Sequence, residues 1–244
     1  MNTEQYQNRC RDCQLKGATL VYRRFLRALL PARCPGCGGA AEDGFCDGCR
    51  DDLERVELPC TGCGRARPVT ACPRVDSGWH IAGVVAPFSY TEPLQGYVQS
   101  LKFAGRRSLG WALGTLLASH VASSPTRRDV NAIVAVPLHR QRFIARGYNQ
   151  AIEIARAVSA ELSIPLLVAG VGRSRATAAQ TGLLAAQRRA NLRGAFSVSR
   201  DLEGLHVAII DDVMTTGATV NALAVELARA GAESVYVWAV ARSL

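Results

Sequence analysis

The sequence predicts an α/β protein in which a mostly parallel, twisted sheet flanked by helices follows a small, cysteine-rich zinc-ribbon module. Apolar runs of strand length alternate with helical patterns from residue 80 to 244, an order typical of parallel sheets with helices on both faces. All nine cysteines lie before residue 73. We therefore expect a basic amphipathic segment at 1–33, a zinc-binding module at 34–78 and an α/β domain at 79–244.

The composition is that of a soluble globular protein, with 48% hydrophobic and 20% charged residues in 244. A net charge of +9 is compatible with polyanionic partners such as nucleic acid or phosphorylated sugars, although a high-GC genome gives the same arginine bias without function. No stretch offers about 18 uninterrupted apolar residues, and residues 1–14 lack a signal-peptide core. We expect no transmembrane segment and a cytoplasmic location.

The cysteine pairs at 34/37 and 60/63 have the form of zinc knuckles, in which a glycine-assisted turn aims two thiolates at one ion. A further pair at 46/49 follows the first knuckle after eight residues. A disulfide framework needs an oxidising compartment, and a redox pair explains one pair but not the repetition, so structural zinc is favoured. The first predicted zinc site consists of Cys34, Cys37, Cys46 and Cys49.

A second zinc site is less complete. Cys60, Cys63 and Cys72 offer three ligands, and position 75, where the spacing calls for a fourth cysteine, is valine. Either Asp76 or His80 completes the site, or the site has been lost. The outlying pair Cys10 and Cys13 receives no role.

The remaining elements follow from hydrophobic periodicity. Residues 21–30 form a short basic amphipathic helix, and residues 80–90 form a strand that begins the larger domain. Two helices cover 94–105 and 111–121, and a buried strand within 129–140 is followed by a helix at 150–162. A strand at 165–171, a long polar connection at 173–196, a helix at 220–230 and a strand at 234–240 complete the chain.

The stretch from 206 to 219 carries the chemistry. An apolar strand ends in Asp211 and Asp212, passes through a Thr/Gly loop and opens into a helix. A helix N-terminus leaves backbone N–H groups unpaired, so a phosphate placed there collects several donors. Gly217 permits a positive φ and a close approach of the backbone. The acid pair can accept hydrogen bonds from vicinal hydroxyls or hold Mg²⁺ through water. A phosphate-binding loop beside a diol-binding acid pair is the combination that a ribose 5-phosphate needs.

The alternative without a bound ligand is a strand end with an Asp turn and a Ser/Thr-type helix cap. A lone cap, however, does not need two acids, two threonines and a glycine in this order. The run 209–219 resembles the PRPP loop of type I phosphoribosyltransferases. The whole chain resembles the ComF family, which is associated with competence and DNA uptake in bacteria, on three further features: a Leu-Lys-Phe segment at 101–103, Arg-Gly-Tyr-Asn-Gln at 146–150, and cysteine pairs that approach a double zinc ribbon. Val75 departs from that ribbon pattern.

The resemblance implies a type I phosphoribosyltransferase-like fold and a site for PRPP or ribose 5-phosphate with Mg²⁺. It implies a pyrophosphate loop at 137–140. It also implies a lid at 173–196, whose Arg173, Arg175 and Arg189 close toward the diphosphate, with an exposed basic hairpin or a nucleic-acid contact as the alternative. Lys102 and Arg106 then face the site, with solvated surface charge as an equal alternative. Asp211, Asp212 and Arg140 are the candidate catalytic residues. The candidate PRPP- and phosphate-binding residues are Thr215, Thr216, Gly217, Ala218, Thr219, Pro137, Leu138, His139, Arg146, Arg173, Arg175 and Arg189.

Three functions fit these residues. The first is transfer of a phosphoribosyl group from PRPP to an acceptor that the sequence does not identify. The second is a non-catalytic accessory of DNA uptake that binds single-stranded DNA and works with a helicase or other competence proteins. The third is a regulator that senses PRPP.

Overall fold

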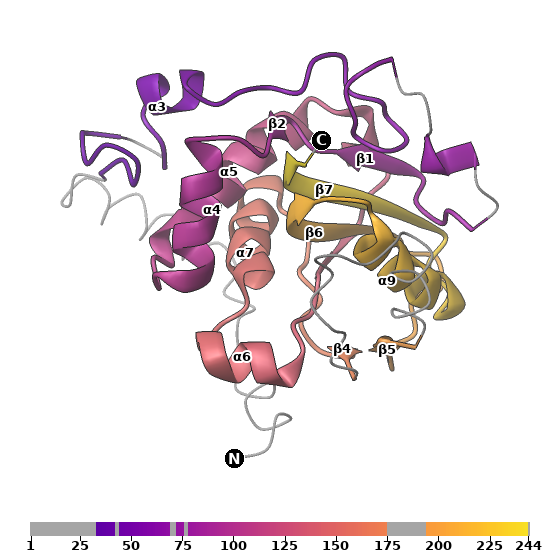
Figure 1. The fold of residues 1–244 in the computed structure, drawn as a ribbon. Helices are drawn as coiled ribbons and strands as arrows, with labels where there is room; N and C mark the ends of the chain where they lie inside the picture. The colour runs from indigo at the N-terminus through magenta and orange to yellow at the C-terminus, as the bar shows by residue number, and fades with distance from the viewer. Residues whose placement is uncertain (1–32, 42–43, 69–71, 76–77, 175–193, 244) are drawn as a thin grey trace.

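The computed structural model describes residues 33–41, 44–68, 72–75, 78–174 and 194–243. Within these residues the centre is a five-stranded sheet made of β1 (Gly83–Val85), β2 (Phe88–Ser89), β3 (Ala132–Ala135), β6 (His206–Met214) and β7 (Ser234–Arg242). The order is β1-β7-β6-β3, β2 also pairs with β7, and every pair is parallel (Figure 1). The predicted helix at 21–30 and the residues Cys10, Cys13, Asp76, Arg175 and Arg189 lie outside the described part.

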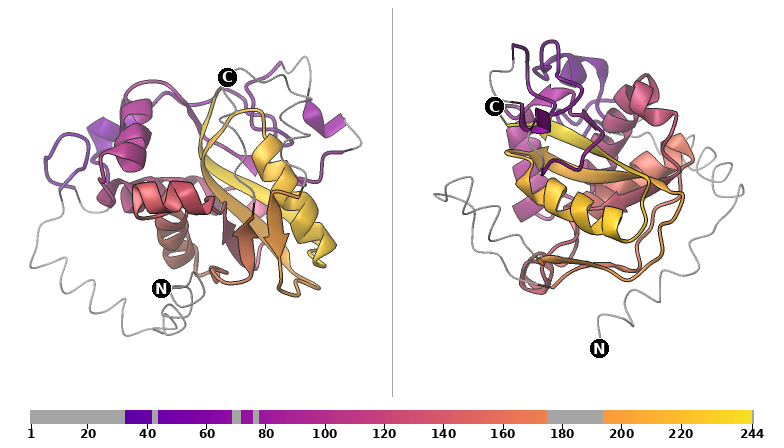
Figure 2. Two further views of the ribbon diagram at one scale, coloured as in Figure 1. Left: turned by 60° about the horizontal axis from the view of Figure 1, so that its bottom comes forward. Right: turned by 90° about the vertical axis from the view of Figure 1, so that its right-hand side faces the viewer.

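Helices cover both faces of the sheet, which confirms the predicted fold class. On one face α5 (Ser108–Ala122) packs against α7 (Gln150–Leu162), and both contact the sheet, with α4 (Leu94–Phe103) beside α5. On the other face lies α9 (Ala218–Arg229) (Figures 1 and 2). The two helices α5 and α7 approach closely, since a Cβ at Gly114 would lie 2.4 Å from the carbonyl oxygen of Ile154. Large side chains such as Trp238, Ile133 and Leu113 are fully buried between the layers.

The central strand β6 is longer than predicted. Residues 207–210 have no exposed surface, as expected for a strand covered on both faces. The strand continues past the acid pair, because β7 runs on to Arg242 and pairs with Val213 and Met214. Asp211 and Asp212 are therefore held by a sheet ladder instead of starting a loop.

Three other elements differ from expectation. The strand predicted at 80–90 is split into β1 and β2, because Pro87 offers no N–H to the ladder. The predicted strand at 165–171 is reduced to one bridge between Leu166 and Ile133, and β4 (Val171–Arg173) instead pairs antiparallel with β5 (Phe196–Val198). An unpredicted helix, α6 (Arg140–Arg146), ends at Gly147, where φ is 80°.

The cysteine-rich part packs directly on the α/β layers. Phe45 and Leu53 are buried in the same hydrophobic core as the sheet and α5. The Val56 N–H donates to the Pro87 carbonyl at 2.9 Å, and the Val84 N–H donates to the Thr61 carbonyl at 2.8 Å. The short helix α3 (Asp47–Asp51) and the 3₁₀ turn η1 (Pro73–Val75) belong to this part, whereas the 3₁₀ turn η2 (Pro125–Arg127) follows α5. The boundaries at 33/34 and 78/79 stay a prediction.

Candidate functional site

A cavity of about 740 Å³ lies at the carboxyl end of β6, the place where ligands bind in open α/β sheets. Its walls come from the end of α4, the segment after β3, the turn between α6 and α7, and the start of α9. Six residues named in the sequence analysis line this cavity: Lys102, Leu138, Arg146, Asp211, Asp212 and Thr219. The structure therefore brings the acid pair, one residue of the phosphate loop and a predicted cation into one space.

Lys102 is the main residue whose role the sequence left open. Its Nζ lies 2.9 Å from Oδ1 of Asp212, and the lysine side chain is 21% exposed. Burial alone would lower the pKa of Lys102, but the charge of Asp212 and the hydrogen bond to it outweigh burial and raise the pKa. Lys102 is thus a cation inside the site. Arg106, the other candidate on this segment, instead donates to the Pro35 carbonyl at 2.6 Å.

The two carboxylates have different surroundings. Asp212 is 3% exposed, and its Oδ2 is buried without a hydrogen-bond partner among the described residues. Asp211 lines the cavity and is partly accessible, and its Oδ1 accepts the Asp212 N–H at 2.9 Å. Removal of the carboxyl of Asp211 from bulk water raises its pKa to about 7, and the neighbouring charge of Asp212 adds to that effect. A cation or sugar hydroxyl placed beside the pair would meet one free oxygen and one titratable carboxyl.

The predicted phosphate loop, residues 215–219, joins β6 to α9. Gly217 has a φ of 82° and caps the helix, which confirms the positive φ expected for this glycine. A Cβ there would lie 2.7 Å from the Trp79 indole, so glycine is also required by packing. The Thr216 hydroxyl accepts the Ala218 N–H at 3.3 Å, which is a capping contact. Thr219 is the loop residue that reaches the cavity wall, while Thr215 is exposed.

The predicted pyrophosphate loop divides between two cavities. Leu138 lines both cavities, whereas Pro137, His139 and Arg140 line only the adjacent one of about 680 Å³. Arg173 also lies on that second cavity. Arg140 starts α6, a helix that the sequence patterns did not predict, although Arg146-Gly147 is a C-terminal signal that could have revealed it. Among the described residues, the cations on the lining of the acid pair's cavity are Lys102, Arg142 and Arg146.

Two polar residues act as helix caps. The Asn149 Oδ1 accepts the Ala151 N–H at 2.9 Å, and its Nδ2 donates to the Val136 carbonyl at 2.9 Å. This buried amide therefore ties α7 to the end of β3. His139 Nδ1 accepts the Gln141 N–H at 3.3 Å and caps α6. Gln150 accepts from Arg146, which orients that guanidinium at the cavity wall.

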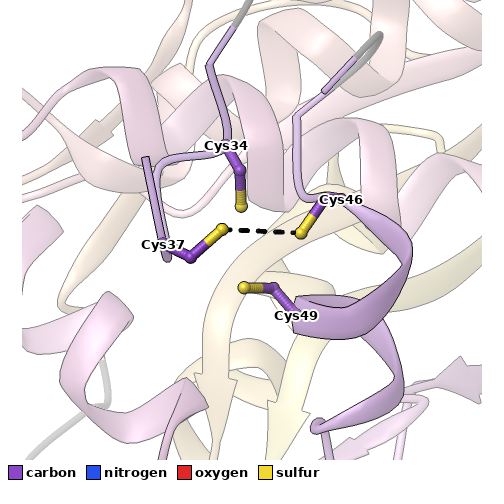
Figure 3. Close-up of side chains that lie close together, drawn as sticks. All are labelled: Cys34, Cys37, Cys46 and Cys49. Carbon is purple, nitrogen blue, oxygen red and sulfur yellow. Dashed lines mark hydrogen bonds between the residues drawn. The ribbon is translucent and has the colours of Figure 1, made fainter. Parts of the chain in front are cut away.

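The first cysteine cluster has the dimensions of a zinc site. The sulfurs of Cys34, Cys37, Cys46 and Cys49 all lie within 4.8 Å of one another and point toward a common centre (Figure 3). Zinc bonds of about 2.3 Å in a tetrahedron separate the sulfurs by about 3.8 Å. The Sγ atoms of Cys37 and Cys46 are 3.6 Å apart. Burial raises the pKa of Cys49 to about 12, so a bound cation is needed to hold all four as thiolates.

The second cluster contains Cys60, Cys63 and Cys72, with all three sulfurs within 4.8 Å of one another. The Sγ atoms of Cys60 and Cys72 are 3.9 Å apart, again a spacing that fits zinc. His80, a predicted substitute for the fourth ligand, does not lie with the three thiols, and among the described residues no other ligand joins them. None of the seven described cysteines forms a disulfide.

No helix in the described ranges has both the length and the apolar character that crossing a bilayer requires.

Comparison with known proteins gives a consistent result. The protein-family model of the phosphoribosyl transferase domain matches residues 148–243. Competence protein F of Haemophilus influenzae is 33% identical over 225 residues, which cover 86% of this chain and 97% of that protein. The DNA utilization protein YhgH of Salmonella typhimurium is 36% identical over 82% of this chain and 91% of that protein. Competence protein ComFC of Streptococcus pneumoniae is 25% identical over 81% of this chain and 87% of that protein.

Proposed function

Because the chain belongs to the ComF family of competence protein F, ComFC and YhgH and carries a phosphoribosyl transferase domain, we propose that it binds PRPP or ribose 5-phosphate in the cavity beside Asp211 and Asp212. One observation carries this proposal. The acid pair and Thr219, at the start of α9, line the same cavity. A phosphorylated pentose needs that combination of a diol-binding end and a phosphate-binding end.

Each end has a physical rationale. The loop 215–219 leads into a helix of twelve residues, whose first N–H groups and dipole favour a phosphate monoester. The carboxylates of Asp211 and Asp212 accept hydrogen bonds from the ribose hydroxyls. The ion pair with Lys102 keeps Asp212 oriented, since a buried carboxylate without a partner would be costly.

If transfer occurs, the bond between C1 of the ribose and the diphosphate oxygen breaks, its electron pair leaves with the diphosphate, and positive charge develops on the sugar. A nucleophilic atom of the acceptor then forms the new bond to C1. The acid pair offsets that charge, while Arg142 and Arg146 on the same cavity wall stabilise the departing diphosphate. Arg140 and Arg173, on the adjacent cavity, remain candidates for contacts with a longer ligand. If Mg²⁺ binds with PRPP, it would supply charge neutralisation for the diphosphate, and the unpartnered Oδ2 of Asp212 is the kind of oxygen ligand that would hold it.

The four-cysteine cluster is the proposed structural zinc site. Its four thiols supply a complete tetrahedral shell, and Phe45 and Cys49 are buried against the α/β core. Zinc there would fix the position of this part of the chain on α4, because the Phe45 and Tyr97 rings lie 4.9 Å apart.

Calorimetry with PRPP and Mg²⁺ tests the proposal. The wild-type protein should bind PRPP, and Asp212→Asn should abolish the signal because the variant loses a charged oxygen in the cavity. Glu161→Gln, which makes the same charge change at an exposed position on α7, serves as the matched control and should bind normally. Equal PRPP affinity of the wild type and Asp212→Asn would place the ligand elsewhere. Diphosphate release with candidate bases then separates an enzyme from a PRPP sensor.

A second candidate function is contact with single-stranded DNA. Phe103 is 79% exposed at the rim of the same cavity, and the Arg146 guanidinium lies 5.3 Å from its ring centroid. An exposed ring beside a guanidinium is a surface on which an unpaired base stacks, at about 1–3 kcal/mol per base. The net charge of +9 favours such a polyanion.

A salt titration of oligonucleotide binding tests this candidate. Phe103→Ala should weaken binding of a single-stranded oligonucleotide about tenfold. Leu58→Ala removes a similarly exposed side chain, 77% accessible, outside the residues that line the cavity. If both variants bind DNA equally well, the ring at 103 is not a stacking surface.

A further inference from the structure

The side chain of Arg242 connects two regions that the proposed function treats separately. It is the last residue of β7 and is fully buried. Its Nε donates to the Cys63 carbonyl at 3.1 Å, and its Nη1 donates to the carbonyls of Met214, at 2.7 Å, and Thr215. One guanidinium therefore joins the second cysteine cluster to Met214, the last residue of β6, and to Thr215, the first residue of the phosphate loop.

Among the described residues, every hydrogen-bond partner of the Arg242 guanidinium is a backbone carbonyl, and none is a carboxylate. A buried guanidinium that loses an acceptor leaves a donor unsatisfied. Four carbonyls, those of Cys63, Met214, Thr215 and Ser243, share this guanidinium, while its Nη2 has no partner among the described residues. Loss of a further acceptor would leave a second nitrogen unsatisfied, which favours the observed arrangement of the carbonyls.

That arrangement sets the direction of the loop's N–H groups. In a trans peptide the C=O of one residue and the N–H of the next point in opposite directions. With the Met214 and Thr215 carbonyls turned toward Arg242, the N–H groups of Thr215 and Thr216 must point away from it. The Met214 carbonyl also accepts the Ser243 N–H of the sheet ladder at 3.0 Å, so Arg242 shares control of the Thr215 N–H with the sheet. The contact of Arg242 with the Thr215 carbonyl is what directs the N–H of Thr216.

At the other end of this connection, residues 60–65 form a tight turn that packs against β1. Within the turn, the Cys60 N–H donates to the Arg65 carbonyl at 2.8 Å, and the Gly64 N–H donates to the Cys60 carbonyl at 2.7 Å. A Cβ at Gly64 would lie 2.9 Å from Val84 in β1, which shows how closely the turn is packed. The Cys63 carbonyl that Arg242 contacts belongs to a residue whose sulfur is part of the three-thiol cluster.

We propose that Arg242 is a positioning residue that couples metal binding at Cys60, Cys63 and Cys72 to the phosphate loop, so that zinc at this cluster raises the affinity of residues 215–219 for a phosphate monoester. Three thiolates supply three of the four zinc positions and pin the turn. Without the ion, the Cys63 carbonyl can move, and the guanidinium follows it and releases the loop carbonyls. The inference rests on the proposed function for its ligand.

The coupling is reciprocal, because two ligands that favour the same conformation raise each other's affinity by the same factor. Ribose 5-phosphate should therefore tighten zinc binding at the second cluster. The first cluster provides an internal comparison. Its contacts run to α4 through Phe45 and to Arg106 through Pro35, and no described contact links it to residues 214–219.

The test compares Cys72→Ser with Cys46→Ser, each of which removes one thiol from one cluster. Calorimetry with ribose 5-phosphate should show affinity about tenfold weaker for Cys72→Ser and changed less than about twofold for Cys46→Ser. Hydrogen exchange of the amides at 214–219 should accelerate in Cys72→Ser and in chelator-treated wild type. Unchanged affinity and unchanged exchange in Cys72→Ser, in a protein whose wild type binds ribose 5-phosphate, would overturn the coupling and leave the proposed function standing.

Arg242→Lys tests the connection itself. Lysine keeps the positive charge but lacks the planar fork that contacts the Cys63 carbonyl and the Met214 and Thr215 carbonyls together. In this background, added zinc should no longer change ribose 5-phosphate affinity or the exchange of residues 214–219, and a retained zinc response would refute the role of Arg242. If the variant does not fold, the pair of cysteine variants decides the matter alone. If the wild type binds no ribose 5-phosphate, the proposed function fails, and the zinc dependence of exchange at 214–219 still supports or overturns the coupling.

Discussion

Replacement of Gly217 by alanine should destabilise the protein through two separate effects. The first is conformational, because the residue has a φ of 82°, where an L-residue loses about 1–2 kcal/mol. The second is steric, because the new Cβ would lie 2.7 Å from the Trp79 ring and 2.8 Å from the Met214 methyl group. Forcing a methyl group into a packed site costs about 1–3 kcal/mol. The free energy of unfolding should therefore fall by about 2–5 kcal/mol.

Urea denaturation of matched variants separates the two effects. Gly204 has a φ of 69°, and nothing lies within 4 Å of the position that a Cβ would take there, so Gly204→Ala should show only the conformational loss of about 1–2 kcal/mol. Trp79→Phe removes the nearest ring atom, so Gly217→Ala should be less destabilising in that background than in the wild type. Equal losses at positions 217 and 204, or no interaction between the Gly217 and Trp79 changes, would refute the steric account of this loop.

Three further outcomes are expected. Burial raises the pKa of Asp211 from 3.8 to about 7, so between these pH values the native state binds more protons than the unfolded chain. The free energy of unfolding should therefore fall as the pH rises from about 4 to about 7. Urea titrations at several pH values should show a flatter decline for Asp211→Asn than for the wild type. Lys102→Met should cost about 3 kcal/mol in the same assay, because Asp212 is left buried without its cation, whereas Lys102→Arg should cost less. Cys49→Ser should lower the zinc content by about one atom per chain in metal analysis, and unchanged content would exclude zinc from the first cluster.

Local sequence patterns predicted most of the elements that surround the candidate site. The helix at 150–162 has the predicted bounds, and the strand, Thr/Gly loop and helix around 206–229 occur in the predicted order. These elements carry strong periodicity and clear end signals. The failed strand at 165–171 depended on a partner instead. Pro165 contributes no N–H, and Gly170 turns the chain at a φ of 85°, so pairing with β3 stops at Leu166.

The sequence could not show which of the two cations, Lys102 or Arg106, faces the acid pair. Both are cations near the end of one helix, and hydrophobic periodicity places Leu101, but neither charge, on the buried face. Their different partners come from tertiary packing, which lays the end of α4 across the carboxyl end of β6 and brings the first cysteine turn to Arg106. The same packing places Arg146 on the acid pair's cavity and Arg140 on its neighbour.

Arg242 illustrates the deeper limit. At the end of an apolar strand, an arginine is ordinarily expected to reach solvent, since arginine is rarely fully buried unless paired. Here its partners are main-chain carbonyls from positions 63, 214, 215 and 243. Every residue type offers such a carbonyl, so no pattern of side chains along the sequence reveals it. The ligand-binding residues of a site of this kind can be identified from their side chains, whereas the residues that hold the loop in position are defined only once the fold brings distant backbone together.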